Sequence, residues 1–256
     1  MNTLPDDSSV ELARRLDVNA RVCRVLSTRQ LSTSIAEAVL EADPALAGVP
    51  GNDIMIRVPD ASGKLIRRRY SIRAFDAERS ELTLWITTDH DGPGSNWVRR
   101  VAPGDLVDVV GPRGKIPLDP DADWHVFLGD ASGLGAFYRM AQSIEAPGRA
   151  IFLVEIDYTD DALTANFDEG LGVTGIFVDR MQRAHNDPAG LLSALAAFEF
   201  PADQGHAYLF GEFSVSKVLR NALIDRGLAE EFISLKAFWR TGRNNAEHGE
   251  PDKSEN

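Results

Sequence analysis

Hydrophobic and polar positions alternate with a period close to two along the first half of the chain. Turn residues such as Asp43-Pro44, Pro50-Gly51 and Ser62-Gly63 separate the alternating runs. This pattern predicts the short strands of a small antiparallel barrel. The expected strands are residues 20–27, 33–42, 53–58, 65–75, 81–88 and 105–111.

The rhythm changes at Trp124, where apolar strands begin to alternate with helix-like segments. Such alternation predicts a parallel sheet covered by helices. The expected strands are residues 124–130, 150–157, 174–178, 206–210 and 231–238, and the expected helices are residues 134–144, 188–198 and 214–227.

The chain has 256 residues, which exceeds the usual size of one domain. We therefore expect two domains, with the boundary in residues 114–123, which are rich in proline and aspartate. The tail lacks core-forming residues and is expected to be disordered. The predicted organisation is a polar leader at 1–19, a six-stranded antiparallel β-barrel at 20–118, an α/β parallel-sheet domain at 119–243 and the tail at 244–256.

Charge and composition exclude several classes of function. A net charge of −12 and a pI near 4.9 argue against nonspecific nucleic-acid binding. The lone Cys23 excludes an intrachain disulfide, and its apolar neighbours predict a buried packing role. No signal peptide or membrane-length apolar stretch is recognisable, so we expect a cytoplasmic protein without membrane insertion. The sequence does not indicate an oligomeric state.

One segment is basic although the chain as a whole is acidic. Residues 64–73 read KLIRRRYSIR, in which five of ten residues are basic. With a period of two, Arg68 shares a face with Ile66, Tyr70 and Ile72. An ordinary half-buried strand would place hydrophobic residues there, so an arginine on this face suggests a bound anion. The alternative is a solvated basic edge that blocks aggregation.

The residue types in this strand suit a ligand that carries both a phosphate and a ring. A guanidinium can donate to phosphate oxygens, a tyrosine can pack on a flat heterocycle, and a serine can bond to its edge. The order Arg-x-Tyr-Ser-x-Arg resembles the flavin-binding strand of ferredoxin-reductase-like flavoproteins. It is most similar to the siderophore-interacting protein family of ferric-siderophore reductases. The resemblance implies that Arg68, Tyr70, Ser71 and Arg73 bind FAD.

A glycine- and proline-containing turn follows at residues 90–97, where Ser95 or Asn96 is expected to cap a helix from Trp97 to Val101. Amides at a helix start favour a pyrophosphate, although a capped surface helix is the simpler alternative. The turn resembles the family's His-Gly-x-Gly-Pro-Ala-Ser-x-Trp segment, with departures at Asp91 and Gly94. This resemblance implies that the FAD phosphates are held by His90, Gly92, Gly94, Ser95, Asn96 and Trp97.

A second glycine-rich turn, residues 129–137, joins the first expected parallel strand to its helix, where α/β sheets bind ligands. Family members typically read Gly-Asp-Glu-Thr-Ala-Leu-Pro-Ala-Ile, so this chain departs from the family at Ala131 and Gly135. The resemblance extends to a Gly-Glu pair and to the closing Trp-Arg-x-Gly. The cofactor-binding residues implied here are Gly129, Asp130, Ser132, Gly211, Glu212 and Trp239.

The donor nucleotide is weakly encoded. The second parallel strand ends near Glu155 and Asp157, without an arginine to receive a 2′-phosphate, which slightly favours NADH over NADPH. Arg180 and Arg183 would reverse this preference by folding back. An electron-carrier protein such as a ferredoxin is a further candidate donor.

Other chemistries find little support. The five histidines lack metal-ligand spacing, and no Gly-x-Ser-x-Gly occurs, so neither a metal site nor a serine hydrolase is expected. The resemblance implies an FAD-dependent reductase of ferric siderophores in which no side chain acts as acid or base. Alternatives are a flavin enzyme with another acceptor, a siderophore-binding protein without turnover, and a fold relative that binds no flavin. The residues expected to meet the anionic siderophore are Lys64, Arg67, Lys236 and Arg240.

Overall fold

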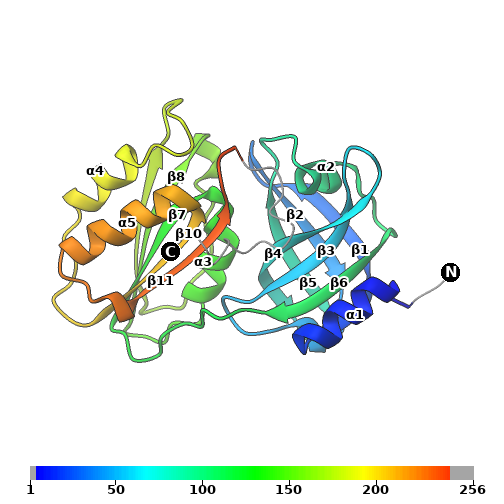
Figure 1. The fold of residues 1–256 in the computed structure, drawn as a ribbon. Coiled ribbons are helices and arrows are strands. Elements are labelled where there is room, and N and C mark those ends of the chain that lie inside the picture. The colour runs from blue at the N-terminus through cyan, green and yellow to red at the C-terminus, as the bar shows by residue number, and fades with distance from the viewer. Residues whose placement is uncertain (1–3, 243–256) are drawn as a thin grey trace. The chain divides into compact units, whose positions relative to one another are not determined.

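The computed structural model describes residues 4–242, and the predicted tail at 244–256 lies outside the described residues. The chain forms two compact units, Met1–Pro117 and Leu118–Asn256 (Figure 1). Each unit has its own sheet and its own hydrophobic core.

The first unit is a closed barrel of six antiparallel strands, which confirms the predicted fold. Its strands follow one another around the barrel in the order β1-β2-β5-β4-β3-β6. Their bounds are β1 Asn19–Gln30, β2 Ile35–Glu41, β3 Asp53–Pro59, β4 Leu65–Asp76, β5 Glu81–Thr87 and β6 Leu106–Arg113.

The barrel core follows from the alternation in the sequence. Inward positions such as Ile54, Ile56, Ile72, Leu82 and Leu84 are fully buried, whereas the positions between them are more exposed. Cys23 belongs to this core, and burial raises the pKa of its thiol to about 12, which confirms a packing role.

Two helices and a short 3₁₀ turn, η1 (Pro44–Leu46), accompany the barrel (Figure 1). Helix α1 (Asp7–Leu16) lies in the segment treated as a leader, and its Ala13 packs against Met55 and Val110. Its start is fixed because Asp6 accepts a hydrogen bond from the Ser8 amide at 2.9 Å. The leader therefore contains a helix that packs on the barrel.

Helix α2 (Pro93–Arg100) begins earlier than the sequence predicts. Gly92 is the N-cap and Pro93 the first helical residue, so the expected capping by Ser95 or Asn96 is wrong. Proline suits this position because its fixed φ is already helical and its missing N–H would have no intrahelical acceptor.

The second unit is a sheet of five parallel strands, which confirms the predicted parallel sheet. The order of the strands is β11-β10-β7-β8-β9. Short 3₁₀ turns interrupt the connections, namely η2 Ala131–Gly133, η3 Thr159–Asp161 and η4 Glu230–Phe232. The strands are β7 Trp124–Asp130, β8 Arg149–Ile156, β9 Gly172–Asp179, β10 Gly205–Glu212 and β11 Ile233–Trp239, and the helices are α3 Leu134–Ala141, α4 Ala189–Ala197 and α5 Phe213–Asp225.

Helices cover both faces of this sheet (Figure 1). On one face, Leu191 of α4 and Leu219 of α5 pack against apolar side chains of the central strands. On the other face, Phe137 of α3 packs on Phe127 of β7 and Phe210 of β10. Strands β7 and β10 are therefore buried along their whole length, as is usual for a parallel sheet. No helix within residues 4–242 has the length and apolar character needed to span a membrane.

Two histidines lie side by side where β7 and β10 begin. His125 and His206 are register partners, and His206 Nδ1 and Nε2 lie 2.9 Å from Asp119 Oδ2 and 3.0 Å from Ser234 Oγ. The His125 ring stacks on Tyr208 with 6.0 Å between ring centroids. Burial, with a smaller contribution from the neighbouring His206, lowers the pKa of His125 to about 4. His125 is therefore held neutral in the folded protein near pH 5 and above.

We expect His125 to make the protein less stable as the pH falls from 6.5 to about 4. In this window the unfolded chain binds a proton that the folded chain does not, so the free energy of unfolding falls by up to ~1.4 kcal/mol per pH unit. His125→Phe keeps a ring and removes the titrating group, and it should flatten this dependence. Urea unfolding at pH 7.5 and 5.0 measures the difference.

The matched control is His185→Gln, which removes an exposed histidine of the same unit and should leave the slope as in the parent protein. An unchanged slope in His125→Phe would contradict the assignment.

Candidate functional site

The basic strand β4 points its two faces in the directions that the alternation predicts. Ile66 and Tyr70 pack against the barrel core, and Ile72 is fully buried in it. Arg68 shares this inward face and is half-buried. A cation thus occupies a position where the neighbouring side chains are part of the core.

Arg68 donates a hydrogen bond to the neighbouring main chain. Its Nη1 donates to the backbone oxygen of Arg67 at 2.7 Å. Burial lowers the pKa of Arg68 from its ordinary value, while the nearby Tyr70 and Asp60 act in the opposite direction. A guanidinium that is partly removed from water and keeps further N–H groups can bind an anion.

The side chain of Tyr70 extends from β4 to helix α2. Its ring stacks on Trp97 with 6.2 Å between centroids, and a Cβ placed on Gly94 would lie 2.2 Å from Tyr70 Oη. Gly94, which departs from the family pattern, is therefore the residue that admits this ring. Burial raises the pKa of Tyr70, and its Oη is buried without a hydrogen-bond partner within residues 4–242.

The turn at residues 90–97 is held mainly by its own side chains. Ser95 Oγ donates to the Thr87 oxygen at 2.6 Å and lies 3.0 Å from His90 Nε2, and the Gly92 amide donates to His90 Nδ1 at 3.0 Å. Asn96 Nδ2 donates to the Asp91 oxygen at 3.0 Å. These side chains shape the turn, so contacts to an anion there would come chiefly from backbone amides.

Arg99 is a residue that sequence reasoning missed. It lies in the last turn of α2, where Nη1 donates to the Thr88 oxygen at 2.5 Å and Nη2 donates to Asn96 Oδ1 at 2.7 Å. It thereby fastens both ends of the turn to the helix. The sequence does contain a pattern that could have indicated Arg99, namely the basic pair Arg99-Arg100 at the end of a short helix that follows a loop.

Arg73 and Ser71 lie on the outward face of β4. The pairing of β4 with β5 shifts between Ile72 and Ala74, so Arg73 is the extra residue of a β-bulge. Its guanidinium carbon lies 4.8 Å from the centroid of the Trp85 ring. Bulges redirect side chains, and this one sets Arg73 on an aromatic face.

The expected substrate residues of β4 and its turn differ in their surroundings. Lys64 is exposed, whereas Arg67 Nη2 donates to Ser8 Oγ of α1 at 2.8 Å. Burial and the nearby Arg57 lower the pKa of Arg67. Arg67 is thus engaged in fastening the N-terminal helix.

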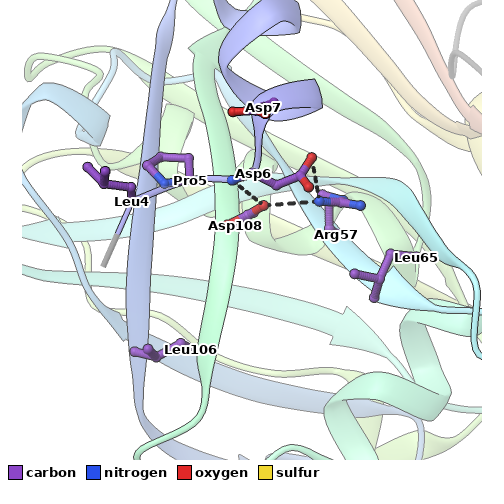
Figure 2. A pocket seen from close by; sticks show the side chains of 8 residues that line it. All are labelled: Leu4, Pro5, Asp6, Asp7, Arg57, Leu65, Leu106 and Asp108. Carbon is purple, nitrogen blue, oxygen red and sulfur yellow. Dashed lines mark hydrogen bonds and ion pairs between the residues drawn. The ribbon is translucent and has the colours of Figure 1, made fainter. Parts of the chain in front are cut away.

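The same corner of the barrel contains a cavity of about 510 Å³, shown in Figure 2. Arg57 Nη1 lies 2.8 Å from Asp6 Oδ1 and 3.2 Å from Asp108 Oδ2, and the Asp6 amide donates to Asp108 at 3.1 Å. These contacts hold the start of α1 on β3 and β6. The cavity is lined by Leu4, Pro5, Asp6, Asp7, Arg57, Leu65, Leu106 and Asp108, so it shares none of the residues predicted to bind FAD.

In the second unit, the glycine-rich turn is built around Asp130 at the end of β7. Asp130 Oδ1 accepts from the Ser132 amide at 2.9 Å and from its hydroxyl at 2.5 Å. Burial raises the pKa of Asp130, against the effect of these hydrogen bonds. A Cβ on Gly129 would lie 1.7 Å from the Phe210 oxygen, and one on Gly211 would lie 2.4 Å from Asp130 Oδ2. Both glycines are thus required by strand packing.

Glu212 and Trp239 complete the same network at the ends of β10 and β11. Asp130 Oδ2 accepts from the Glu212 amide at 2.9 Å and from Trp239 Nε1 at 3.0 Å. Glu212 Oε2 accepts from the Val215 amide at 2.9 Å, and its Oε1 accepts from the Thr241 amide at 3.1 Å. The predicted residues therefore do come together, as a network that orders the carboxyl edge of the sheet.

Four cations of the second unit lie over aromatic rings, among them Arg226, which lies 4.8 Å from the centroid of the Phe200 ring. Arg240 and Lys217 both approach Phe213, at 4.9 and 5.3 Å from its centroid, and Lys236 lies 5.4 Å from that of Phe238. Such cations are attracted by the negative face of the ring. Arg240 and Lys236 are the two that the sequence analysis assigns to the substrate.

The inward face of β4 fits a flavin nucleotide. Tyr70 offers an aromatic face and an unpartnered buried hydroxyl, and Arg68 offers a partly desolvated cation beside it. Helix α2 begins where Gly94 admits the tyrosine ring, so its first amides lie near the same residues. These groups suit a ring joined to a pyrophosphate.

Comparison with known proteins agrees with this assignment. Residues 41–116 match the family model described as siderophore-interacting FAD-binding domain, and residues 122–242 match the one described as siderophore-interacting protein. The first unit is accordingly an FAD-binding domain.

Relatives of described activity are distant. Ferric vibriobactin reductase ViuB of Vibrio cholerae is 26% identical over 190 residues, which cover 71% of this chain and 67% of the relative. The NADPH-dependent ferric-chelate reductase of Escherichia coli is 25% identical over 170 residues, which cover 64% of this chain and 63% of that protein. The chain thus spans about two thirds of the length of these relatives.

Among solved structures, a siderophore utilization protein from T. fusca is 25% identical with a TM-score of 0.77, and the match covers 90% of this chain and 96% of that chain. The two family models together account for both folded units. The chain therefore belongs to the siderophore-interacting protein family.

Proposed function

We propose that this protein is an FAD-dependent reductase that takes electrons from a nicotinamide nucleotide and gives them to the iron of a ferric siderophore. The observation that carries the proposal is the pair formed by Arg68 and Tyr70 on the inward face of β4, where the buried Tyr70 Oη has no partner within residues 4–242. Family membership and the two reductases among the relatives support it.

The residues of the chain bind and orient in this mechanism. Arg68 and the first amides of α2 would hold the pyrophosphate of FAD, and Tyr70 would pack on its ring, whereas Ser71 lies on the opposite, outward face of β4. When bound there, FAD would supply the redox chemistry, because a flavin can take up an electron pair and pass electrons on singly. No side chain has to transfer a proton.

The substrate proposal rests on charge. A ferric siderophore with hard oxygen ligands is commonly anionic, and Lys64, Lys236 and Arg240 offer cations against an overall charge of −12. Iron release follows from reduction, since ferrous iron binds hard oxygen ligands less tightly. Arg67 contributes less in this scheme because Ser8 engages it.

The decisive experiment is anaerobic reduction followed by absorbance. NADH or NADPH should bleach the flavin bands, and a ferric siderophore should restore them while a ferrous chelator reports released iron. Bands that persist with both nucleotides but bleach with reduced ferredoxin would replace the nicotinamide with a protein donor. Chelate binding without any bleaching would replace the reductase with a binding protein.

Arg68→Gln should weaken FAD binding by about 10- to 100-fold, because a charge-assisted hydrogen bond contributes roughly 1.5–3 kcal/mol. Titration of the apoprotein with FAD, followed by absorbance, measures the affinity. Arg79→Gln is the matched control, since Arg79 is an exposed arginine of the same barrel. Equal affinity in the two variants would contradict the role of Arg68.

Gly94→Ala should destabilise the apoprotein by ~1–3 kcal/mol, because the added Cβ overlaps Tyr70 Oη. In a Tyr70→Phe background the same change should cost clearly less, since the nearest remaining atom is a ring carbon at 3.2 Å from that Cβ, compared with 2.2 Å for Oη. Urea unfolding of the four proteins gives this double-mutant cycle.

Gly175→Ala is a suitable control for the cycle, because its Cβ would meet an atom only at 3.5 Å. A cost of Gly94→Ala that is the same with tyrosine and with phenylalanine would rule out the proposed contact.

A further inference from the structure

Two arginines fold back onto the end of β8 in the second unit. Arg180 is 4% exposed, and its Nη1 lies 2.7 Å from Glu155 Oε2 while its Nε lies 2.6 Å from Asp157 Oδ1. Arg183 Nη2 lies 2.9 Å from Glu155 Oε1 and also donates to the Asp179 oxygen at 3.0 Å. Both oxygens of the buried Glu155 are thus bound to guanidinium groups.

The backbone between the two arginines is constrained. Met181 and Gln182 have φ values of 51° and 62°, a left-handed conformation that non-glycine residues rarely adopt. Asp179 Oδ1 accepts from the Met181 amide at 2.7 Å, and the Arg183 amide donates to the Arg180 oxygen at 3.0 Å. Ion pairs at both ends of the turn hold it in this conformation.

This cluster lies at the end of β8, the position at which α/β sheets commonly contact the ribose of a bound nucleotide. β8 is the strand after the glycine-rich turn, and Glu155 is the register partner of Asp130, which builds that turn. A carboxylate at this strand end accepts a bond from a ribose 2′-hydroxyl, whereas an arginine there binds a 2′-phosphate. Here both kinds of residue are present and bound to each other.

The balance of charge opposes a 2′-phosphate. Two carboxylates, those of Glu155 and Asp157, pair with the two arginines. A third carboxylate, that of the exposed Asp179, accepts from the Met181 amide in the turn between the arginines. If Arg183 turned to a phosphate, it would leave a carboxylate that is 2% exposed with one partner fewer, which is unfavourable. A hydroxyl adds no charge and leaves the ion pairs intact.

We propose that the cluster of Glu155, Asp157, Arg180 and Arg183 makes this chain select NADH over NADPH. The inference rests on the proposed function, in which the second unit binds the nicotinamide donor. It differs from the simple expectation that arginines which fold back would favour NADPH, because here the carboxylates neutralise them.

Binding of two nucleotide fragments tests the selection without turnover. Isothermal titration of the FAD-loaded protein with 5′-AMP and with 2′,5′-ADP compares a ribose hydroxyl with a ribose phosphate. We expect 5′-AMP to bind about tenfold more tightly, the effect of bringing like charges together at a site with excess carboxylate.

Glu155→Gln keeps the shape of the side chain and removes one negative charge, so it should bring 2′,5′-ADP to the affinity of 5′-AMP. Asp179→Asn provides a second, exposed variant that retains the acceptor for the Met181 amide, and it should tighten 2′,5′-ADP by about threefold. Glu145→Gln, an exposed change of equal charge before the start of β8, should alter neither affinity.

Tighter binding of 2′,5′-ADP than of 5′-AMP by the parent protein would overturn the inference, and so would binding of neither fragment. These outcomes are distinct from failure of the proposed function. If the protein reduces ferric siderophore equally well with NADH and with NADPH, only the proposed selection of NADH is refuted. If neither nucleotide nor reduced ferredoxin bleaches the flavin bands, the proposed reductase function is refuted.

Discussion

The first unit depends on a polar interruption in the inward face of β4. A closed barrel removes its interior from water, and Ile54, Ile72 and Leu84 show how completely the other inward positions are buried. Arg68 and Tyr70 are the polar exceptions on this face of β4, and the lack of a side chain at Gly94 leaves room for the tyrosine hydroxyl. A buried hydroxyl without a partner and a partly desolvated cation are unfavourable in an empty barrel. In the function that we propose, the phosphate and ring of the flavin would offset this cost.

In the second unit, by contrast, the polar residues at the sheet edge form hydrogen bonds with one another. Asp130 binds Ser132, the Glu212 amide and the Trp239 indole, so the ends of three strands are joined by one carboxylate. The resemblance to the family assigns these residues to nucleotide contacts, whereas the structure shows that they order the sheet edge on which a nucleotide would lie. Replacing one of these residues would therefore disturb the structure of the sheet edge first, and would affect ligand binding only as a consequence. Glycines at the same edge serve strand packing for the same reason.

Much of this architecture could be predicted from the sequence because it is encoded locally. Alternation gave the strands of the barrel within a few residues, and the change of rhythm at Trp124 gave the parallel sheet. Contacts between distant residues could not be predicted in this way. The approach of Gly94 to Tyr70, the attachment of Arg67 to Ser8 and the pairing of Arg180 with Glu155 each join segments that only the fold brings together. Helix α1 was missed because its polar surface hides a narrow apolar stripe.

The two units differ in how their arginines are partnered. The overall charge of −12 repels polyanions, so only small anions that reach individual cations can bind. In the barrel, Arg68 is left with N–H groups for a phosphate, whereas in the sheet Arg180 and Arg183 are neutralised by carboxylates. Arginine alone therefore does not mark an anion site in this protein. What distinguishes the two cases is the number of acidic neighbours within hydrogen-bonding distance, and that number is a property of the fold.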